Sequence, residues 1–388
     1  MNPGRVLRPR RYAIAGAIAL AALGAQMTVA FAAPEMWMIV PSPNPAATLA
    51  TLASVSCPDS TSCFAVGDRF AHGKDRPLVE RWDGTAWSVV AAPDLAVMGS
   101  LGAVSCVSSR SCMAVGDSFA PTGGLARTLI AHWDGGSWSR IASPTPGQGA
   151  MLAGVSCVDT SNCAAVGELT SASGIQRTLV ERWNGSTWSV IASPNPSGVG
   201  SSLSSVSCST ASACFAVGEH EPSQQTGRTL VEEWNGTSWT VVPSPNVSSS
   251  SVSKLGGVVC TAPNACAAVG SYLGAQGSTT LAETWSGTSW RVVPSANVAG
   301  NGSLFSVSCA SANDCVAVGV HARSTGVNAT LIEQWQGTRW TTVSHPNPTP
   351  SKGASLLGVD CRVRATCVAV GDNAPTASTE STLVEQRQ

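Results

Sequence analysis

Short hydrophobic segments, in which apolar side chains alternate with small or polar ones, recur along the whole chain between clusters of Gly, Pro, Asn and Ser. Each copy reads L-x-x-V-S-C, C-x-A-V-G, T-L-V-E-x-W and, after a turn, W-S-V-V-x-S-P. Short β-branched runs bounded by turn residues predict strands. The pattern therefore predicts an all-β protein built from a repeated unit of four strands.

The period of the repeat is almost constant. The first cysteine of each copy lies at position 57, 106, 157, 208, 260, 309 or 361, so neighbouring copies are 49 to 52 residues apart. A period of this size, with four strands in each unit, is typical of a β-propeller blade. We therefore expect a seven-bladed β-propeller of four-stranded antiparallel blades, with repeats over about 50–98, 99–149, 150–200, 201–252, 253–301, 302–353 and 354–388.

The two ends of the chain carry complementary parts of one unit. The seventh copy ends at Gln388, before its fourth segment, whereas Trp37 to Pro45 (WMIVPSPNP) repeats Trp188 to Pro196 (WSVIASPNP). An open stack of repeats gains nothing from such parts, but a ring closes when the first strand completes the last sheet. We therefore expect a strand over 36–41 to complete the last blade.

All fourteen cysteines fall into seven pairs with the spacing C-x5-C. A short hairpin between the first and second strands brings the two members of a pair within disulfide reach. Zinc is the weaker alternative, because structural zinc sites favour closer spacing and need four ligands together. The expected bridges are Cys57–Cys63, Cys106–Cys112, Cys157–Cys163, Cys208–Cys214, Cys260–Cys266, Cys309–Cys315 and Cys361–Cys367.

Twelve of the thirteen tryptophans form pairs that flank the turn between the third and fourth strands, as in Trp183 and Trp188. Asn-Gly and Asp-Gly in this turn favour a hairpin, because both central positions of a two-residue turn need positive φ. For a loop of two or four residues, both tryptophans lie on one face of the sheet. We interpret the pairs as packing between blades rather than as an aromatic ligand cage. The remaining Trp37 should face Arg387, whose guanidinium would stack on it.

Residues 1–32 differ from the rest of the chain. Four arginines precede an apolar run that ends in Ala30-Phe31-Ala32, which fits a small-x-small cleavage site. We interpret this segment as an export signal of the Sec type, with 33–388 as a single propeller domain. An uncleaved segment that tethers the protein to the cell surface is the alternative.

Removal of the signal takes away four positive charges and changes the formal net charge from −1 to about −5. No basic patch points to nucleic acid as a partner. The sequence therefore predicts a secreted, weakly acidic, monomeric protein outside the cell.

A ligand site is expected where the copies differ from one another. In a propeller, the first-to-second and third-to-fourth turns share one face, and the second-to-third loops and the crossovers between blades share the other. The first set of turns is nearly invariant here, whereas the second set varies in length and content. A single asymmetric site needs such variation. We therefore place the site on the variable face near the central channel, with unconstrained solvent loops as the alternative.

Acids follow A-V-G in five copies, where they would rim the channel mouth and attract a cation or sugar hydroxyls. The alternative is that they are strand-end residues facing water. Two histidines lie two residues beyond the same glycine in the fourth and sixth copies, and one tyrosine lies in the variable segment of the fifth. The candidate ligand-binding residues are Asp68, Asp117, Glu168, Glu219, His220, Tyr272, His321 and Asp372.

A second acidic series lies in the third strand of six copies. Catalysis needs one group of each kind rather than six, so we interpret this series as part of the scaffold. The chain has no nucleophile elbow, zincin motif or phosphate loop, and we expect no catalytic residues, cofactor or metal site. The series consists of Glu80, Glu181, Glu232, Glu283, Glu333 and Glu385, with Ala131 in the second copy.

Val155 to Gly167 (V-S-C-x5-C-x-A-V-G) and Thr178 to Val190 (T-L-V-E-x-W-N-G-S-x-W-S-V) resemble repeats in secreted β-propeller proteins of actinobacteria and related soil bacteria, a group of uncharacterised function. The resemblance covers nearly all of 35–388, and the group is loosely similar to kelch/galactose-oxidase or sialidase-type propellers. The catalytic motifs of those enzymes are missing. Asp83 lies four residues before Trp87, where a sialidase Asp-box has five, and no sialidase arginine triad or galactose oxidase copper site is matched.

These observations favour a non-enzymatic extracellular binding or scaffold protein that meets a glycan, peptide or surface partner through its variable loops. The rival is a hydrolase or lyase that acts on polysaccharide with carboxylates on the same face. An enzyme should have a deep asymmetric pocket with clustered acids, His or Tyr from different blades, and a binder should have a shallow surface. The fold does not decide between them, because propellers serve both purposes.

Overall fold

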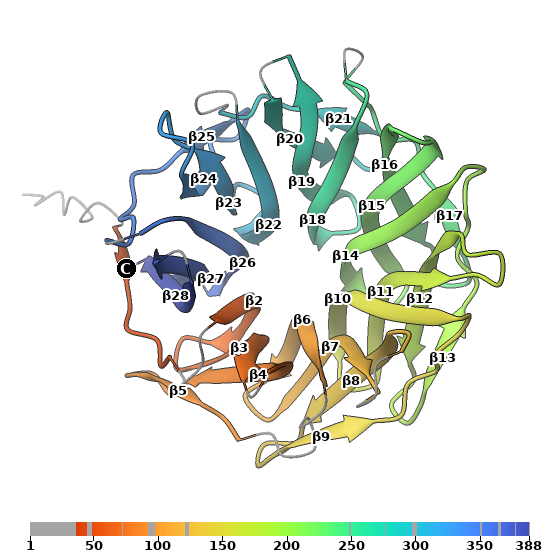
Figure 1. Cartoon of the computed structure of the whole chain (residues 1–388). Helices are drawn as coiled ribbons and strands as arrows, with labels where there is room; N and C mark the ends of the chain where they lie inside the picture. Colours follow the sequence, from red (N-terminus) through yellow and green to blue (C-terminus); the bar gives the residue numbers. More distant parts are fainter. Residues whose placement is uncertain are drawn as a thin grey trace, which may run out of the picture. The chain divides into compact units, whose positions relative to one another are not determined.

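The chain forms seven four-stranded antiparallel sheets arranged as blades around a central channel (Figure 1). The fold is therefore a seven-bladed β-propeller, as the repeats predict. A computed structural model describes residues 36–44, 49–71, 73–91, 98–120, 124–247, 250–275, 277–296, 301–349, 351–363, 366–376 and 378–387. The predicted export signal lies outside this part of the chain. Within it, no helix is long and apolar enough to span a bilayer.

Consecutive strands form each blade from the centre outward. The first strands are β2 (Leu49–Asp59), β6 (Met98–Ser108), β10 (Gly149–Asp159), β14 (Gly200–Thr210), β18 (Ser253–Ala262), β22 (Gly302–Ser311) and β26 (Ala354–Val363). The second strands are β3 (Ser62–Ala71), β7 (Ser111–Phe119), β11 (Asn162–Thr170), β15 (Ala213–Ser223), β19 (Ala265–Gly274), β23 (Asp314–Ala322) and β27 (Thr366–Thr376). The third strands are β4 (Lys74–Trp82), β8 (Arg127–Trp133), β12 (Gln176–Trp183), β16 (Thr226–Trp234), β20 (Gly277–Trp285), β24 (Asn328–Trp335) and β28 (Thr379–Arg387). The fourth strands are β5 (Trp87–Val89), β9 (Trp138–Ile141), β13 (Trp188–Ile191), β17 (Trp239–Val241), β21 (Trp290–Val292), β25 (Trp340–Thr342) and, for the seventh blade, β1 (Trp37–Ile39).

The ring closes as the complementary chain ends predict. Strand β1 pairs antiparallel with β28, and Trp37 lies opposite Arg387. The Trp37 side chain is buried, and the Arg387 guanidinium lies 3.8 Å from the carboxylate of Asp314 in the sixth blade. Stacking of Arg387 on Trp37 stays a prediction. Strands β2 and β26 also contact each other, so the first and last blades are neighbours in the ring.

All seven predicted disulfides are present. Each joins the end of a first strand to the start of the second. Cys157 and Cys163, for example, are direct partners in the antiparallel register, with Cα atoms 4.0 Å apart. Chain entropy assigns about 2 kcal/mol to a bridge across so short a loop. Because disulfides persist where the surroundings are oxidising, seven of them indicate such an environment.

The A-V-G motif is explained by a bulge in each first strand. In the fourth blade the register between β14 and β15 shifts between Leu203 and Ser205, opposite Gly218. A Cβ atom on Gly218 would lie 2.0 Å from the carbonyl oxygen of Ser202, so no side chain fits. The same close approach recurs at Gly67, Gly116, Gly167, Gly270, Gly319 and Gly371.

The turn between the third and fourth strands has four residues. In the third blade, Oδ1 of Asn184 accepts hydrogen bonds of 2.9 Å from the backbone N–H groups of Ser186 and Thr187. Gly185 has a φ of 93°, and Asn184 is not among the described residues with positive φ. The Asn-Gly signal therefore acts through a side-chain cap and one glycine, not through two residues with positive φ.

The tryptophans pack between blades, as predicted. Trp82 and Trp87 are cross-strand neighbours with ring centroids 5.9 Å apart. Trp87 shares a hydrophobic cluster with Val370 of the last blade. At the next interface, the Phe64 ring lies 5.1 Å from Trp133. Apolar burial between blades accounts for these contacts.

The two faces of the ring have different loops. On one, which we call the hairpin face, the two tight turns of a blade contact each other: Nε1 of Trp183 donates to the Thr160 carbonyl at 3.0 Å. On the other, the variable-loop face, second-to-third loops contact the crossovers: the Val199 N–H donates to the Glu221 carbonyl at 2.8 Å. This division matches the expectation from the sequence.

Candidate functional site

The five acids that follow A-V-G lie on second strands, toward the variable-loop face. Each pairs with a residue of the neighbouring first strand, as Asp117 does with Ser100 and Asp372 with Ser355. They therefore stand one strand back from the channel wall. The acids are Asp68 on β3, Asp117 on β7, Glu168 on β11, Glu219 on β15 and Asp372 on β27.

These acids are not spread evenly around the ring, because several gather across the seventh, first and second blades. Burial, followed by the charges of Asp75 and Asp117, raises the pKa of Asp68 to about 6. Glu380 raises it further, and the pKa of Glu380 is itself raised by burial and by Asp372. Carboxylates perturb one another in this way when they share a poorly solvated space. We call Asp68, Asp75, Asp117, Asp372 and Glu380 the acidic arc.

Serine hydroxyls of the first strands hold two members of the acidic arc. The Ser100 hydroxyl donates to Oδ1 of Asp117 at 2.6 Å, and the Ser355 hydroxyl donates to Oδ1 of Asp372. Burial nevertheless raises the pKa of both carboxyls. Two of the five carboxylates of the acidic arc are thus held by hydrogen bonds within their own blades.

The third and fourth blades hold a separate, smaller acidic pair. Burial and the charge of Glu219 raise the pKa of Glu168, and Nε2 of Gln176 donates to Oε1 of Glu168 at 2.9 Å. The fifth and sixth blades carry Ser271 and Val320 at the equivalent positions, so the acidic character of this face is asymmetric.

The remaining candidates lie on three consecutive blades, the fourth, fifth and sixth. Nδ1 of His220 lies 3.2 Å from the Ser201 hydroxyl in the fourth blade. His321 stands two blades further on, where burial lowers its pKa. Between them, Tyr272 packs against the hydrophobic cluster of the fourth and fifth blades. Among the described residues, no three His, Cys, Asp or Glu side chains are grouped as metal ligands would be.

The central channel contains two cavities of about 540 and 220 Å³, lined mainly by Ser, Val, Ala and Gly of the first strands. Asp360 is the only carboxylate that lines either one among the described residues. Its Oδ2 accepts a hydrogen bond of 2.8 Å from the Cys57 N–H of the next blade. Ser156 accepts the Cys208 N–H at 3.0 Å in the same way. Such links join neighbouring blades at six interfaces of the described wall, and this part of the channel lacks a pair of acids for glycoside hydrolysis.

Comparisons with known proteins agree on the architecture. No protein-family model and no curated protein matches the chain. A solved structure described as YCF48 bound to D1 peptide is 14% identical with a TM-score of 0.53, over 90% of this chain and 96% of that one. The GH74 xyloglucanase from Xanthomonas campestris is 15% identical with a TM-score of 0.54, over 90% of this chain and 55% of that one. A PL25 ulvan lyase is 8% identical with a TM-score of 0.56, over 88% of this chain and 94% of that one.

This chain is a β-propeller repeat protein. At such low identities, the likeness establishes the fold alone. The similar structures include a propeller with a bound peptide and propellers named as polysaccharide-acting enzymes, so they do not distinguish the two functions considered for this propeller.

The second acidic series forms buried links between neighbouring blades of the propeller. At the interface of the third and fourth blades, the Ser193 hydroxyl donates to Oε2 of Glu232 at 2.7 Å. It also lies 2.8 Å from the hydroxyl of Thr178. Glu232 is fully buried. The six links are Thr382–Ser42–Glu80, Thr128–Ser143–Glu181, Thr178–Ser193–Glu232, Thr229–Ser244–Glu283, Thr280–Ser295–Glu333 and Thr330–His345–Glu385.

The interface of the first and second blades lacks all three members of this link in its sequence. The equivalent positions hold Pro77, Ala92 and Ala131. A buried carboxylate that lacks its hydrogen-bond donor destabilises the fold. The absence of all three members together is therefore consistent with a link whose Thr, Ser and Glu are either all present or all replaced. The scaffold role expected for the series is thus supported by contacts. Sequence reasoning missed His345 and Asp360, although aligning the copies shows each in place of a serine.

These buried carboxyls predict that the propeller is more stable in mild acid than in mild base. Burial raises the pKa to about 8 for Glu232 and Glu283 and to about 7 for Glu80, Glu181 and Glu333. The pKa of each of these carboxyls is higher in the folded protein than in the unfolded chain. The stabilisation that they contribute is therefore complete below about pH 4.5 and is lost as pH rises through 7 to 8. We expect Tm to fall by about 10 °C between pH 5 and pH 8.5, measured by calorimetry.

Glu232→Gln tests the assignment, because it keeps an acceptor for Ser193 and removes the titration. Its Tm should depend less on pH than that of the unmodified protein, whereas Glu233→Gln, a charge change at the partly exposed neighbour, should leave the dependence as it was. Equal slopes for all three proteins would contradict a buried, titrating Glu232.

Proposed function

We propose that this protein is an extracellular, non-enzymatic binding propeller, and that its variable-loop face recognises a peptide or protein segment with basic side chains. The acidic arc carries this proposal. The charges of Asp75, Asp117 and Glu380, from three blades, raise the pKa of the partly buried Asp68, and a bound cation relieves that repulsion. The arc lies among the loops that vary between copies, as a single asymmetric site requires.

Three further observations agree with a secreted binder. Seven disulfides suit an oxidising compartment such as the outside of the cell. Rigid blades with exposed variable loops present a preformed surface, which reduces the entropic cost of binding. A structurally similar propeller has been solved with a peptide bound.

A binding array tests the proposal. Basic, neutral and acidic peptides are arrayed beside glycans and cell-wall polymers, and binding is read at low and physiological salt. We expect basic peptides to be retained preferentially and to be released by salt, because the attraction is between partly exposed charges. The double variant Asp68→Asn/Asp75→Asn should lose at least about tenfold in affinity, whereas Glu168→Gln, outside the arc, should not. Preference for a glycan or for acidic peptides would overturn the proposal.

One observation favours the second function, a hydrolase or lyase that acts on polysaccharide. Asp68 has a pKa of about 6, which is in the range of a general acid, and it lies near other carboxylates. Release of reducing ends or of unsaturated products from polysaccharides, measured on the same polymers, tests this function. Activity that is lost in Asp68→Asn would establish the enzyme, and its absence from the whole panel would leave the binding function in place.

A further inference from the structure

A cavity on the hairpin face between the fifth and sixth blades stands apart from the acidic arc. It has a volume of about 210 Å³, which is smaller than typical sites for drug-sized ligands and suits one side chain. Its floor includes the buried Ala267 and Trp340, and its rim includes the exposed Ala312 and Asn313. Trp335 of the sixth blade forms part of its wall.

The residues that fill the equivalent space elsewhere explain why this interface is hollow. Six third strands carry a tryptophan, and the seventh carries Arg387 in its place. Two positions of the preceding blade contact this tryptophan: the residue after the second cysteine, as in Phe64 against Trp133, and the residue before the blade's own third-strand tryptophan, as in Arg182 against Trp234. These two are cross-strand neighbours, as Ala267 and Thr284 are in the fifth blade. The pairs in chain order are Phe64/Arg81, Met113/His132, Ala164/Arg182, Phe215/Glu233, Ala267/Thr284, Val316/Gln334 and Val368/Gln386. The fifth pair is the smallest.

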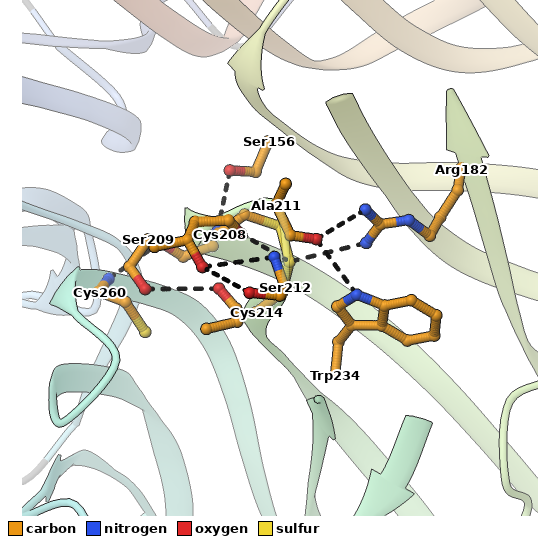
Figure 2. The surroundings of a disulfide bond; sticks show 12 residues. Ser156, Arg182, Cys208, Ser209, Ala211, Ser212, Cys214, Trp234 and Cys260 are labelled. Atoms are coloured by element: carbon orange, nitrogen blue, oxygen red, sulfur yellow. Dashed lines mark hydrogen bonds between the residues drawn. A yellow bond between two sulfur atoms is a disulfide. The ribbon is translucent and has the colours of Figure 1, made fainter. Parts of the chain in front are cut away.

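The interface of the third and fourth blades is the closest template, because it also has alanine at the first position. There, the guanidinium carbon of Arg182 lies 4.6 Å from the ring centroid of Trp234. Its Nη2 donates to the Ala211 carbonyl at 3.0 Å. Figure 2 shows this arrangement, in which the indole N–H of Trp234 also points to the Ala211 carbonyl. A guanidinium from within the protein thus fills the space that Ala164 leaves.

The fifth and sixth blades repeat these partners without the arginine. Trp335 corresponds to Trp234, Ala312 to Ala211 and Ala267 to Ala164, whereas Thr284 stands where the template has Arg182. Trp335, Ala312 and Thr284 all line the cavity. Thr284 and Asn313 add polar side chains to the lining.

We propose that this cavity, defined by Thr284, Ala312, Asn313 and Trp335, binds the guanidinium group of an arginine side chain from a partner protein. The bound group would stack on Trp335 and donate to the Ala312 carbonyl, as Arg182 does one interface earlier. An aromatic side chain is the less suitable occupant. Phe64 and Phe215 reach their tryptophans from the second-strand position, whose counterpart, Ala267, is buried at the floor of the cavity. This site goes beyond the proposed function and lies on the opposite face.

The experiment uses the exported, disulfide-bonded protein and three blocked tripeptides, Gly-Arg-Gly, Gly-Lys-Gly and Gly-Phe-Gly, with binding followed by NMR of the indole N–H signals and by calorimetry. We expect Gly-Arg-Gly to bind the site that shifts an indole signal at least about tenfold more tightly than Gly-Lys-Gly does, because only guanidinium is planar and offers a fork of donors. Preference for Gly-Phe-Gly, or no shift of any indole signal at saturating peptide, would overturn the proposal.

Two reciprocal variants locate the site. Thr284→Arg places an arginine where the third blade has Arg182. It should abolish the indole shift caused by Gly-Arg-Gly while keeping or raising Tm. Arg182→Thr opens the template interface and should increase the number of sites at which Gly-Arg-Gly shifts an indole signal from one to two. Ala267→Phe closes the cavity by a second route, in case Thr284→Arg folds poorly. Unchanged binding in both closing variants would place the arginine site elsewhere and reject the proposal.

The acidic arc supplies the control that separates the two proposals. Asp68→Asn/Asp75→Asn should leave binding of Gly-Arg-Gly at the cavity beside Trp335, which we call the indole cavity, unchanged. Thr284→Arg should leave retention of ligands by the variable-loop face unchanged. Loss of the indole shifts in the arc variant would show that the peptide binds the arc and would exclude the cavity.

Discussion

Deletion of Glu35 to Pro45 is expected to destabilise the propeller by more than about 5 kcal/mol, or to prevent folding. The deletion removes the fourth strand of the last blade and the buried Trp37. It also removes the Ser42 hydroxyl that donates to the fully buried Glu80 at 2.7 Å. A buried carboxylate that loses its donor adds its desolvation cost to the lost packing. Thermal and denaturant unfolding under oxidising conditions measure the effect.

Two controls separate ring closure from simple loss of chain. Met38→Ser changes an exposed side chain of β1 and leaves its ladder with β28 intact, so we expect less than about 0.5 kcal/mol. A synthetic peptide of residues 36–44, added to the deleted protein, should restore part of the stability by strand addition, whereas the same peptide with Trp37→Ala should not. A deleted protein that melts like the full chain would refute the role of β1 in closing the ring.

Gly218→Ala is expected to cost about 3 kcal/mol or more, although alanine is the smallest possible change. The new Cβ would lie 2.0 Å from the Ser202 carbonyl oxygen and 2.8 Å from the Leu203 Cα. Both are backbone atoms at the bulge of β14, so relief requires a shift of the strand. That strand lines the channel and contacts both neighbouring blades. Chemical denaturation with unchanged disulfides measures the loss.

Gly102→Ala is the matched control in the second blade. Its Cβ would lie 3.6 Å from the nearest atoms, which is ordinary contact, and its φ is not positive. We expect a change within about 0.5 kcal/mol, because alanine also restricts the unfolded chain. Equal costs at the two positions would show that glycine at Gly218 is needed for some reason other than the bulge.

The acidic arc and the indole cavity make different uses of the same repeated blade. The arc arises where neighbouring copies keep an acid at one strand position, so that charges from three blades accumulate. The cavity arises where one copy has lost bulk, so that a space filled elsewhere by Arg182 or Phe64 is left open to solvent. The cavity is thus produced by a departure from the average copy, whereas the arc combines acids that most copies share with Asp75 and Glu380, which belong to single copies.

Much of the architecture was already determined by the sequence. The spacing of L-x-x-V-S-C, C-x-A-V-G and the paired tryptophans describes contacts within one blade, which are local in the chain and therefore leave a periodic pattern. The pairing of Cys157 with Cys163, the register of Trp183 with Trp188 and the closing role of Trp37 follow from that pattern.

Only the tertiary structure decided the contacts between blades. That Ser193 meets Glu232 of the next blade, that the charge of Asp117 raises the pKa of Asp68, and that Thr284 leaves a hollow beside Trp335 depend on how one sheet is rotated against the next around the ring. A single sequence records which residues each copy carries. Which side chains of adjacent copies meet depends on the twist and packing of sheets around the ring, where buried volume and charge must be balanced across each interface.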